Sequence, residues 1–171
     1  MILPDYLAKD LVILFVGTAA SDISAAEGHY YANPSNRFWQ LLFHAGLTDH
    51  LLSAEDDSTM IHYGLGMTDV VKTQHSGDDT RLVKEHVIAG RQPLHQKIQQ
   101  YAPNIVCFTS KNAFQAYFGY RAQSFGLHAE TIGDSRVFIT PSPSPRVPAL
   151  QMFNGKTRCA WFRELRALAD R

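Results

Sequence analysis

The residues with the clearest chemical potential lie in two loops, each of which follows an apolar run. The first loop begins at Gly17, after six consecutive apolar residues, and its centre is Thr18-Ala19-Ala20. The second is the segment Thr140–Arg146, in which three prolines in five residues exclude both helix and strand. Strand-end turns of the first kind often carry a catalytic side chain, but this centre has no carboxylate, amide or imidazole.

Acid–base chemistry at the first loop would therefore have to come from neighbouring side chains. The candidates are Asp22, Glu27, His29 and Asp69, because a positioned carboxylate or imidazole can act as a general base. Asp69 directly follows Thr68, so in a strand these two side chains point to opposite faces. For Asp22 the sequence favours a different role, a cap for the helix that follows the turn.

The cysteines and histidines do not form a metal-site pattern. Cys107 and Cys159 are far apart in apolar surroundings, which is typical of buried free thiols. An iron–sulfur cluster usually needs four thiolates and is excluded. The histidines show no pair at helical spacing, so we expect no metal site.

Composition indicates an ordinary globular protein. The 171 residues are 45% hydrophobic and 19% charged, which fits one domain over residues 1–171 with a sizeable core. The net charge of zero argues against binding nucleic acid by bulk charge, although a local basic face remains compatible with it. No apolar run approaches the roughly 20 residues of a transmembrane helix, and the N-terminus lacks a signal-peptide pattern. We expect a cytoplasmic monomer.

Short apolar runs alternate with helical patterns along the chain. The predicted strands cover residues 11–17, 105–109 and 137–140, with a weaker segment at 62–69. Helical patterns lie at residues 35–46, 94–101, 112–118 and 161–168. Nearly continuous apolar strands are typical of parallel sheets that are buried on both faces. The sequence therefore predicts a three-layer α/β/α sandwich with a short, mainly parallel central sheet. Because ligands bind at the carboxyl ends of such strands, the two loops should share one cleft.

One family matches these features in order along the chain. The stretch 17–39 resembles the first signature of the mismatch-specific uracil/thymine DNA glycosylases, part of the uracil-DNA glycosylase superfamily. In that family a Gly-Ile-Asn-Pro-Gly loop leads to a Pro-x-Asn-x-Phe-Trp helix start. The last match is Pro-Ser-Pro-Ser-Pro-Arg at 141–146, which is similar to the family's Pro-Ser-Ser-Ser-Ala-Arg loop. Between them lie matches at 63–68, 90–91, 111 and 125–127.

The resemblance implies an enzyme of DNA repair in the nucleoid that works without a metal or cofactor. Its partner would be double-stranded DNA with a mismatched or deaminated base: uracil, hypoxanthine, xanthine, or thymine opposite G. The base is flipped into a pocket and its bond to the sugar is hydrolysed, which leaves an abasic site. Such a site needs an activated water, donors for the departing base, an aromatic face and a group that fills the vacated stack.

The resemblance also assigns roles to individual residues. Tyr31, which follows Tyr30 in the same loop, aligns with the aromatic that stacks on the flipped base. Backbone N–H groups around Thr18 and Tyr31 would donate to the base carbonyls. Thr68 aligns with a threonine that helps to position the water.

The DNA backbone contacts are assigned in the same way. Ser142, Ser144 and Lys111 would contact phosphates around the flipped nucleotide. Arg146 aligns with an arginine that plugs the vacated stack in part of the family.

The chain departs from the family at the water-activating asparagine, where it has Ala19. Ser142 stands where other branches of the superfamily have a histidine. A related branch with a Gly-Leu-Ala-Pro loop also has alanine at the position of this asparagine, and its members still cleave uracil and deaminated purines. The role of the asparagine would then fall to Thr68, Asp22 or Asp69, and a slow enzyme is expected.

Two other functions remain open from the sequence. One is a catalytically weak or silent protein that binds damaged bases. The other is an α/β protein that acts on free nucleotides, which ranks lower because the chain lacks Gly-x-Gly-x-x-Gly and Lys-Ser/Thr phosphate-loop motifs.

Overall fold

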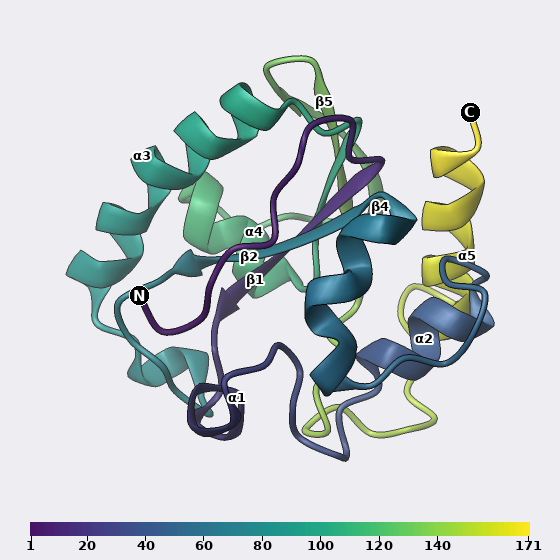
Figure 1. The fold of residues 1–171 in the computed structure, drawn as a ribbon, viewed down its shortest axis with the longest axis horizontal. Coiled ribbons are helices and arrows are strands. Elements are labelled where there is room, and N and C mark those ends of the chain that lie inside the picture. Colours follow the sequence, from purple (N-terminus) through teal and green to yellow (C-terminus); the bar gives the residue numbers. More distant parts are fainter.

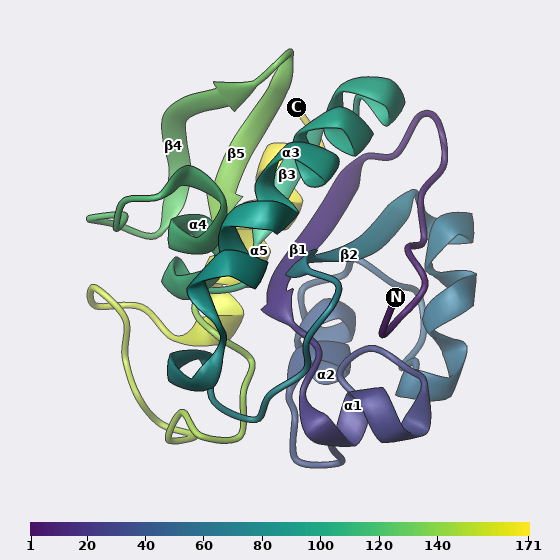
Figure 2. The same ribbon diagram turned by 90° about the vertical axis from the view of Figure 1, so that its left-hand side faces the viewer.

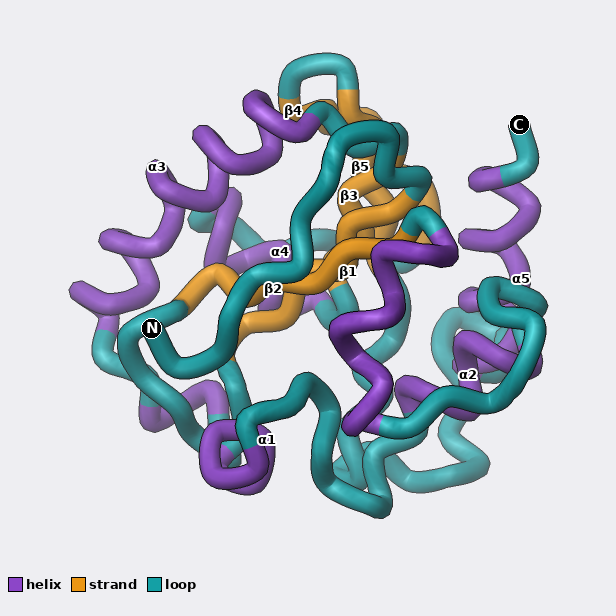
Figure 3. Tube along the Cα trace, in the orientation of Figure 1, coloured by secondary structure: helices purple, strands orange, loops and turns teal.

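The computed structural model describes the whole chain, residues 1–171, around a central sheet of five strands. The strands are β1 (Ile13–Ala19), β2 (Leu65–Val71), β3 (Ile105–Phe108), β4 (Gly126–Ile132) and β5 (Ser135–Ile139). Their spatial order is β2-β1-β3-β5-β4, and all neighbours are parallel except β4 and β5. The sheet forms the middle of the molecule, with loops gathered at its ends (Figure 3).

Helices cover both faces of the sheet. They are α1 (Asp22–Glu27), α2 (Phe38–His44), α3 (Lys84–Tyr101), α4 (Lys111–Phe118) and α5 (Arg158–Ala169), with 3₁₀ helices η1 (Ala54–Tyr63) and η2 (Asp79–Arg81). Helices α3 and α4 lie on one face, while α2, η1 and α5 lie on the other (Figures 1 and 2). The predicted three-layer α/β/α fold with a mainly parallel sheet is therefore confirmed. No helix is both long and apolar enough to cross a lipid bilayer.

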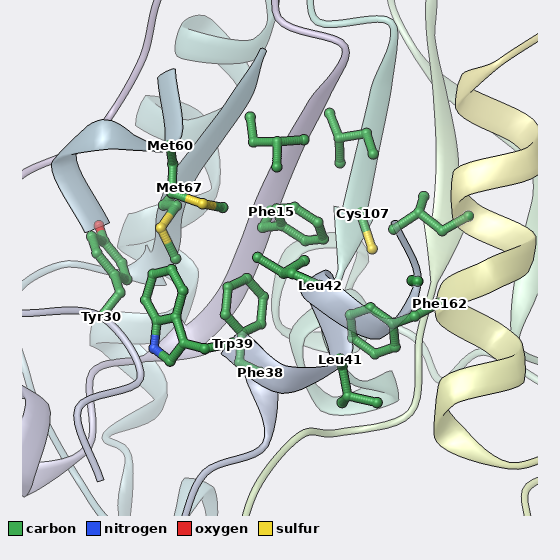
Figure 4. Close-up of a cluster of buried hydrophobic side chains, with 14 of the residues drawn as sticks. Phe15, Tyr30, Phe38, Trp39, Leu41, Leu42, Met60, Met67, Cys107 and Phe162 are labelled. Atoms are coloured by element: carbon green, nitrogen blue, oxygen red, sulfur yellow. The ribbon is translucent and has the colours of Figure 1, made fainter. Parts of the chain in front are cut away.

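The alternation of side chains along β1 divides the core into two layers. Leu14 and Val16 pack beneath α3 and α4, and Ile13 and Phe15 pack on the opposite face. The latter layer contains the aromatic and aliphatic side chains of α2, with Phe162 of α5 among them (Figure 4). Both faces of β1 are thus buried, as its continuous apolar run predicts.

Two element boundaries differ from the sequence prediction in ways that affect the site. Strand β1 continues two residues beyond Gly17, so the tight turn begins after Ala19. Edge strand β4 was not predicted, because exposed residues alternate along it with buried or half-buried ones and its apolar run is therefore interrupted. The weaker segment at 62–69 is a strand only from Leu65 onward, since residues 62 and 63 end η1.

The N-terminal cap of α1 determines where the first loop ends. Ser21 caps α1, because its Oγ accepts from the Ser24 N–H at 3.1 Å. The interpretation of Asp22 as the cap is therefore wrong: Asp22 is the first helical residue, and Ser21 has already taken the capping position.

Candidate active site at the carboxyl ends of the strands

A cleft of about 600 Å³ lies at the carboxyl ends of β1, β2 and β3. Both loops singled out in the sequence line it, so the prediction of a shared cleft is correct. Thr18 and Ala19, at the end of β1, lie in its wall. Strand β1 runs toward α1, which lies at this same end of the sheet (Figure 1). The position agrees with the general rule that open parallel sheets bind ligands here.

The carboxylate of Asp69 lies over Gly17 in the wall of this cleft. Parallel pairing places Asp69 of β2 directly beside Gly17 of β1. A Cβ atom on Gly17 would come within 2.5 Å of Asp69 Oδ1, so any other residue at position 17 would displace the carboxylate. The glycine of the first loop therefore makes room for an acid on the neighbouring strand.

The environment of Asp69 raises the pKa of its carboxyl. Burial raises the pKa of this carboxyl from 3.8 to about 6; the positive charge of Lys72 opposes the rise, and Asp5 and Asp79 add to it. Asp69 is only 6% exposed and still lines the cleft. At neutral pH, which lies above this pKa, Asp69 is mostly ionised. Its carboxylate can therefore accept a proton.

Thr68 points to the other face of β2, away from the cleft. Its hydroxyl donates to Asp5 Oδ1 at 2.6 Å. Asp5 also forms ion pairs with Lys72 at 2.9 Å and with Lys97 at 2.5 Å. The structure does not bring Thr68 to the cleft, whereas its neighbour Asp69 lies there.

Tyr31 stands in the cleft wall with one ring face already covered. Its ring stacks on Phe38 with a centroid separation of 4.0 Å and an interplanar angle of 13°. Its hydroxyl lies 3.0 Å from Thr109 Oγ1, and burial raises the pKa of the phenol. Because Tyr31 lines the cleft, the ring face opposite Phe38 is the one on which a planar ligand could stack.

Asp57 of η1 holds the loop that carries Tyr31. This carboxylate is 1% exposed; its Oδ2 accepts from the Tyr30 N–H at 2.9 Å, and its Oδ1 lies 3.1 Å from His29 Nδ1. The Trp39 indole N–H donates to the Tyr31 carbonyl at 3.2 Å. Tyr31 itself has a φ of 51°, an unusual value for a non-glycine residue, and these contacts maintain it.

Tyr30 belongs more to the core than to the cleft. It is 3% exposed, and its hydroxyl donates to the Pro4 carbonyl at 2.8 Å and accepts from Lys72 Nζ at 3.0 Å. Its edge reaches the cleft, but its hydroxyl is fully engaged elsewhere. It therefore supports the loop more than it offers groups to a ligand.

The proline-rich loop forms the opposite wall of the cleft. The hydroxyls of Ser142 and Ser144 accept from the N–H groups of Ser144 and Arg146, each at 3.2 Å. These local turns fix both serines in the cleft wall. Arg146 lies at the rim, and its Nη1 is 3.6 Å from Asp78 Oδ2 in the β2–α3 loop.

The remaining predicted residues lie at the rim or outside the cleft. The carboxylate of Asp22 is at the rim, 2.7 Å from His75 Nδ1. Lys111 does not line the cleft: its Nζ lies 4.5 Å from the centre of the Phe125 ring and donates to the Gln123 carbonyl at 3.4 Å.

Sequence reasoning missed three residues that shape the site. Thr109 was assigned to the end of a strand, and its position after an apolar run at the carboxyl edge was an available signal. Asp57 and Arg158 act on loops far away in the chain, and no local pattern identifies them.

An α/β/α sandwich with a cleft at the strand ends, walled by an aromatic ring and a buried carboxylate, defines an α/β protein with a ligand-binding cleft. The family model of the uracil DNA glycosylase superfamily matches residues 4–167, and the chain belongs to this superfamily. Its fold is similar to the solution NMR structure of a provisionally assigned uracil DNA glycosylase from Methanosarcina acetivorans. That likeness has a TM-score of 0.58 at 24% identity and covers 96% of each chain. Superfamily membership supports DNA glycosylase activity in general.

Proposed function

We propose that this protein is a monofunctional DNA glycosylase that removes uracil from mismatched double-stranded DNA and leaves an abasic site. Hypoxanthine, xanthine and thymine opposite G are further candidate substrates. The protein would act as a monomer. One observation carries the proposal: Asp69 supplies a buried carboxylate to a cleft whose first loop has alanine in place of the family's asparagine.

The base would enter the cleft after rotation out of the duplex. It would stack on the free face of Tyr31, whose other face rests on Phe38. The Thr109 hydroxyl, which contacts that of Tyr31, would meet the polar edge of the base. The N–H of Tyr31 makes no hydrogen bond within the protein and is therefore a donor for the departing base.

Asp69 would hold and activate the water. The water oxygen attacks C1′ of the deoxyribose while the bond from C1′ to the base nitrogen breaks, and the bonding electron pair leaves with the base. The proton from water passes to the Asp69 carboxylate, and N–H and O–H donors stabilise the departing base anion. The negative charge of Asp69 also stabilises the oxocarbenium character that develops on the sugar.

Ala19 favours a second candidate, a protein that binds damaged bases with little or no turnover. Its methyl group lines the cleft where the family has a water-binding amide. Such a protein would keep the Tyr31 stacking face and the Arg146 rim contact.

Labelled duplexes that contain one uracil, thymine opposite G, hypoxanthine or xanthine test both candidates. Incubation with the protein followed by alkali should cut the strand at the modified base if it is excised. No scission by stoichiometric protein over hours would overturn the catalytic proposal. Tighter binding to mismatched than to matched duplex, without scission, would support the second candidate.

A further inference from the structure

Arg158, at the start of α5, is buried without a neutralising partner. It is 4% exposed, and its Nη1 donates to the carbonyls of Ser142 at 3.0 Å and Ser144 at 3.3 Å. Its Nη2 is buried and has no hydrogen-bond partner. The one charged group that acts on it is another cation, Arg37; burial and this charge both lower the pKa of Arg158.

A cation in this position is costly for folding. Buried charges are normally paired, and an apolar side chain of similar volume often stabilises a protein as well or better. Stability of the isolated chain therefore does not account for this arginine. An anion that arrives from outside would neutralise it.

The contacts of Arg158 orient the proline-rich loop. The carbonyls of Ser142 and Ser144 turn toward Arg158, and the carbonyl of Pro143 between them accepts from the Arg37 N–H at 3.0 Å. Acceptor oxygens of the loop are thus directed into the protein. An anion at the outer surface of the loop would not meet them.

The same loop exposes hydrogen-bond donors. Prolines 143 and 145 have no N–H, and the N–H groups of Ser144 and Arg146 are bound to the hydroxyl oxygens of Ser142 and Ser144. Each hydroxyl accepts one bond, so its own hydrogen remains available to donate. These two hydroxyls belong to side chains that line the cleft, so both can donate to a ligand there.

The rest of the cleft is unfavourable for a phosphate. The charged residues that line the cleft are four carboxylates and one arginine: Asp22, Asp69, Asp78, Asp79 and Arg146. Arg146 is partly neutralised by its ion pair with Asp78. Two further cations adjoin the Ser142–Ser144 segment: buried Arg158 and exposed Arg37, whose N–H donates to the Pro143 carbonyl.

We propose that Arg158 is the positioning residue of a phosphodiester-binding loop. It draws the loop carbonyls inward, leaves the hydroxyls of Ser142 and Ser144 to donate to a DNA phosphate, and attracts that phosphate by its unneutralised charge. This inference rests on the proposed function, because it takes DNA as the ligand.

Binding of a uracil-containing duplex by Arg158→Met and Arg158→Lys at several salt concentrations tests the inference. Arg158→Met should weaken binding at least tenfold and reduce the slope of log K against log salt by about 1. Arg158→Lys keeps the charge but not the forked geometry, so it should keep the slope and show intermediate affinity. The excision rate at saturating protein should change less than the affinity.

Arg136→Met is the matched control, because Arg136 also donates to a backbone carbonyl, but that carbonyl belongs to Leu168, which is not part of the cleft wall. It should leave affinity and salt slope unaltered. Arg158→Met should unfold at the wild-type temperature or above, since an unpaired buried charge is removed. Lower thermal stability with unchanged affinity and slope would overturn the inference and make Arg158 a structural residue.

Failure of the inference is distinguishable from failure of the proposed function. If the wild-type protein neither binds nor cleaves any of the duplexes, the proposed function is wrong. If it does bind and Arg158→Met binds equally well, only the inference is wrong. Should Arg158→Met not fold, the double change Ser142→Ala with Ser144→Ala tests the same loop, with the same expected loss of affinity and slope.

Discussion

The two walls of the cleft are both held by a buried charge, but the charges are opposite and are satisfied differently. On the wall that carries Tyr31, the carboxylate of Asp57 accepts from the Tyr30 N–H and contacts the ring of His29. On the proline-rich wall, the guanidinium of Arg158 donates to carbonyls and has no counter-ion. One charge is satisfied within the chain, and the other is left without a neutralising partner.

This difference suggests a division of labour. The Tyr31 wall is complete before a ligand arrives and can define the position of a base to within a fraction of an ångström. The proline-rich wall retains an unneutralised charge, which suits it to capture a DNA strand. Substitutions in or next to the Tyr31 wall should therefore lower the rate of the chemical step. Substitutions in the proline-rich wall should lower the affinity for DNA.

The largest effect is expected for Asp69→Asn, beneath the Tyr31 wall. Loss of the general base should lower excision by about 10²–10⁴-fold while affinity for the duplex is retained. Single-turnover assays and binding titrations measure the two quantities separately. Asp22→Asn is the control, because Asp22 is an exposed rim carboxylate paired with His75, and it should excise at close to the wild-type rate.

The pH dependence of the wild-type protein gives a second test of the same residue. Excision should fall as the pH drops through about 6, where Asp69 becomes protonated. Because folding raises this pKa from 3.8, ionised Asp69 destabilises the fold; this cost is absent below the unfolded pKa and complete above about 6. Asp69→Asn should therefore unfold at a higher temperature than wild type at neutral pH, but not near pH 4. Equal melting temperatures at neutral pH would contradict the burial of an ionised group.

A smaller loss is expected for Asp57→Asn, which weakens the support of the Tyr31 wall. Replacing the charged acceptor of the Tyr30 N–H should cost about 1–3 kcal/mol of stability and lower the excision rate at saturation. Thermal unfolding and single-turnover kinetics measure the two effects. The salt slope of DNA binding should not change, and a changed slope would remove the distinction between the walls.

Arg146→Ala should weaken lesion binding by about tenfold, or about 1.4 kcal/mol. The arginine is exposed at the rim, and its ion pair with Asp78 contributes little to folding, so the protein should remain as stable as wild type. Titration of a uracil-containing duplex measures the change. Unchanged turnover at subsaturating protein would exclude Arg146 as the group that fills the vacated stack.

The smallest effect, and a gain, is expected for Ala19→Asn. It restores the amide that the family uses to hold water and should raise uracil excision severalfold. A fall in rate would show that Asp69 and an amide at position 19 compete for one space. Single-turnover rates for uracil opposite G decide between these outcomes.

The sequence predicts the sheet well, because β1 and β3 are continuous apolar runs with polar stops. It also predicts correctly that Thr68 and Asp69 face opposite ways. Which of them faces the cleft depends on the pairing of β2 with β1 and on the contact of Thr68 with Asp5, sixty-three positions away in the chain. Local periodicity contains no such information.

The same limit explains the residues that the sequence misplaced or missed. Lys111 follows a strand as expected, but its side chain lies over Phe125 and does not line the cleft, although its neighbours Ser110 and Asn112 do. Asp57 and Arg158 each contact a loop that is distant in the chain. Their importance follows from burial and charge together, which only the folded chain reveals.

The overlap between Gly17 and Asp69 has a consequence for how such a site can change over time. A side chain at position 17 of β1 and an acid at position 69 of β2 exclude each other: a change at Gly17 alone makes the two clash, and a change at Asp69 alone leaves neither group in place. Variants that move the water-holding group from one strand to the other must therefore alter both positions together. A library that varies residues 17, 19 and 69 jointly would reach alternatives that one-at-a-time mutagenesis cannot.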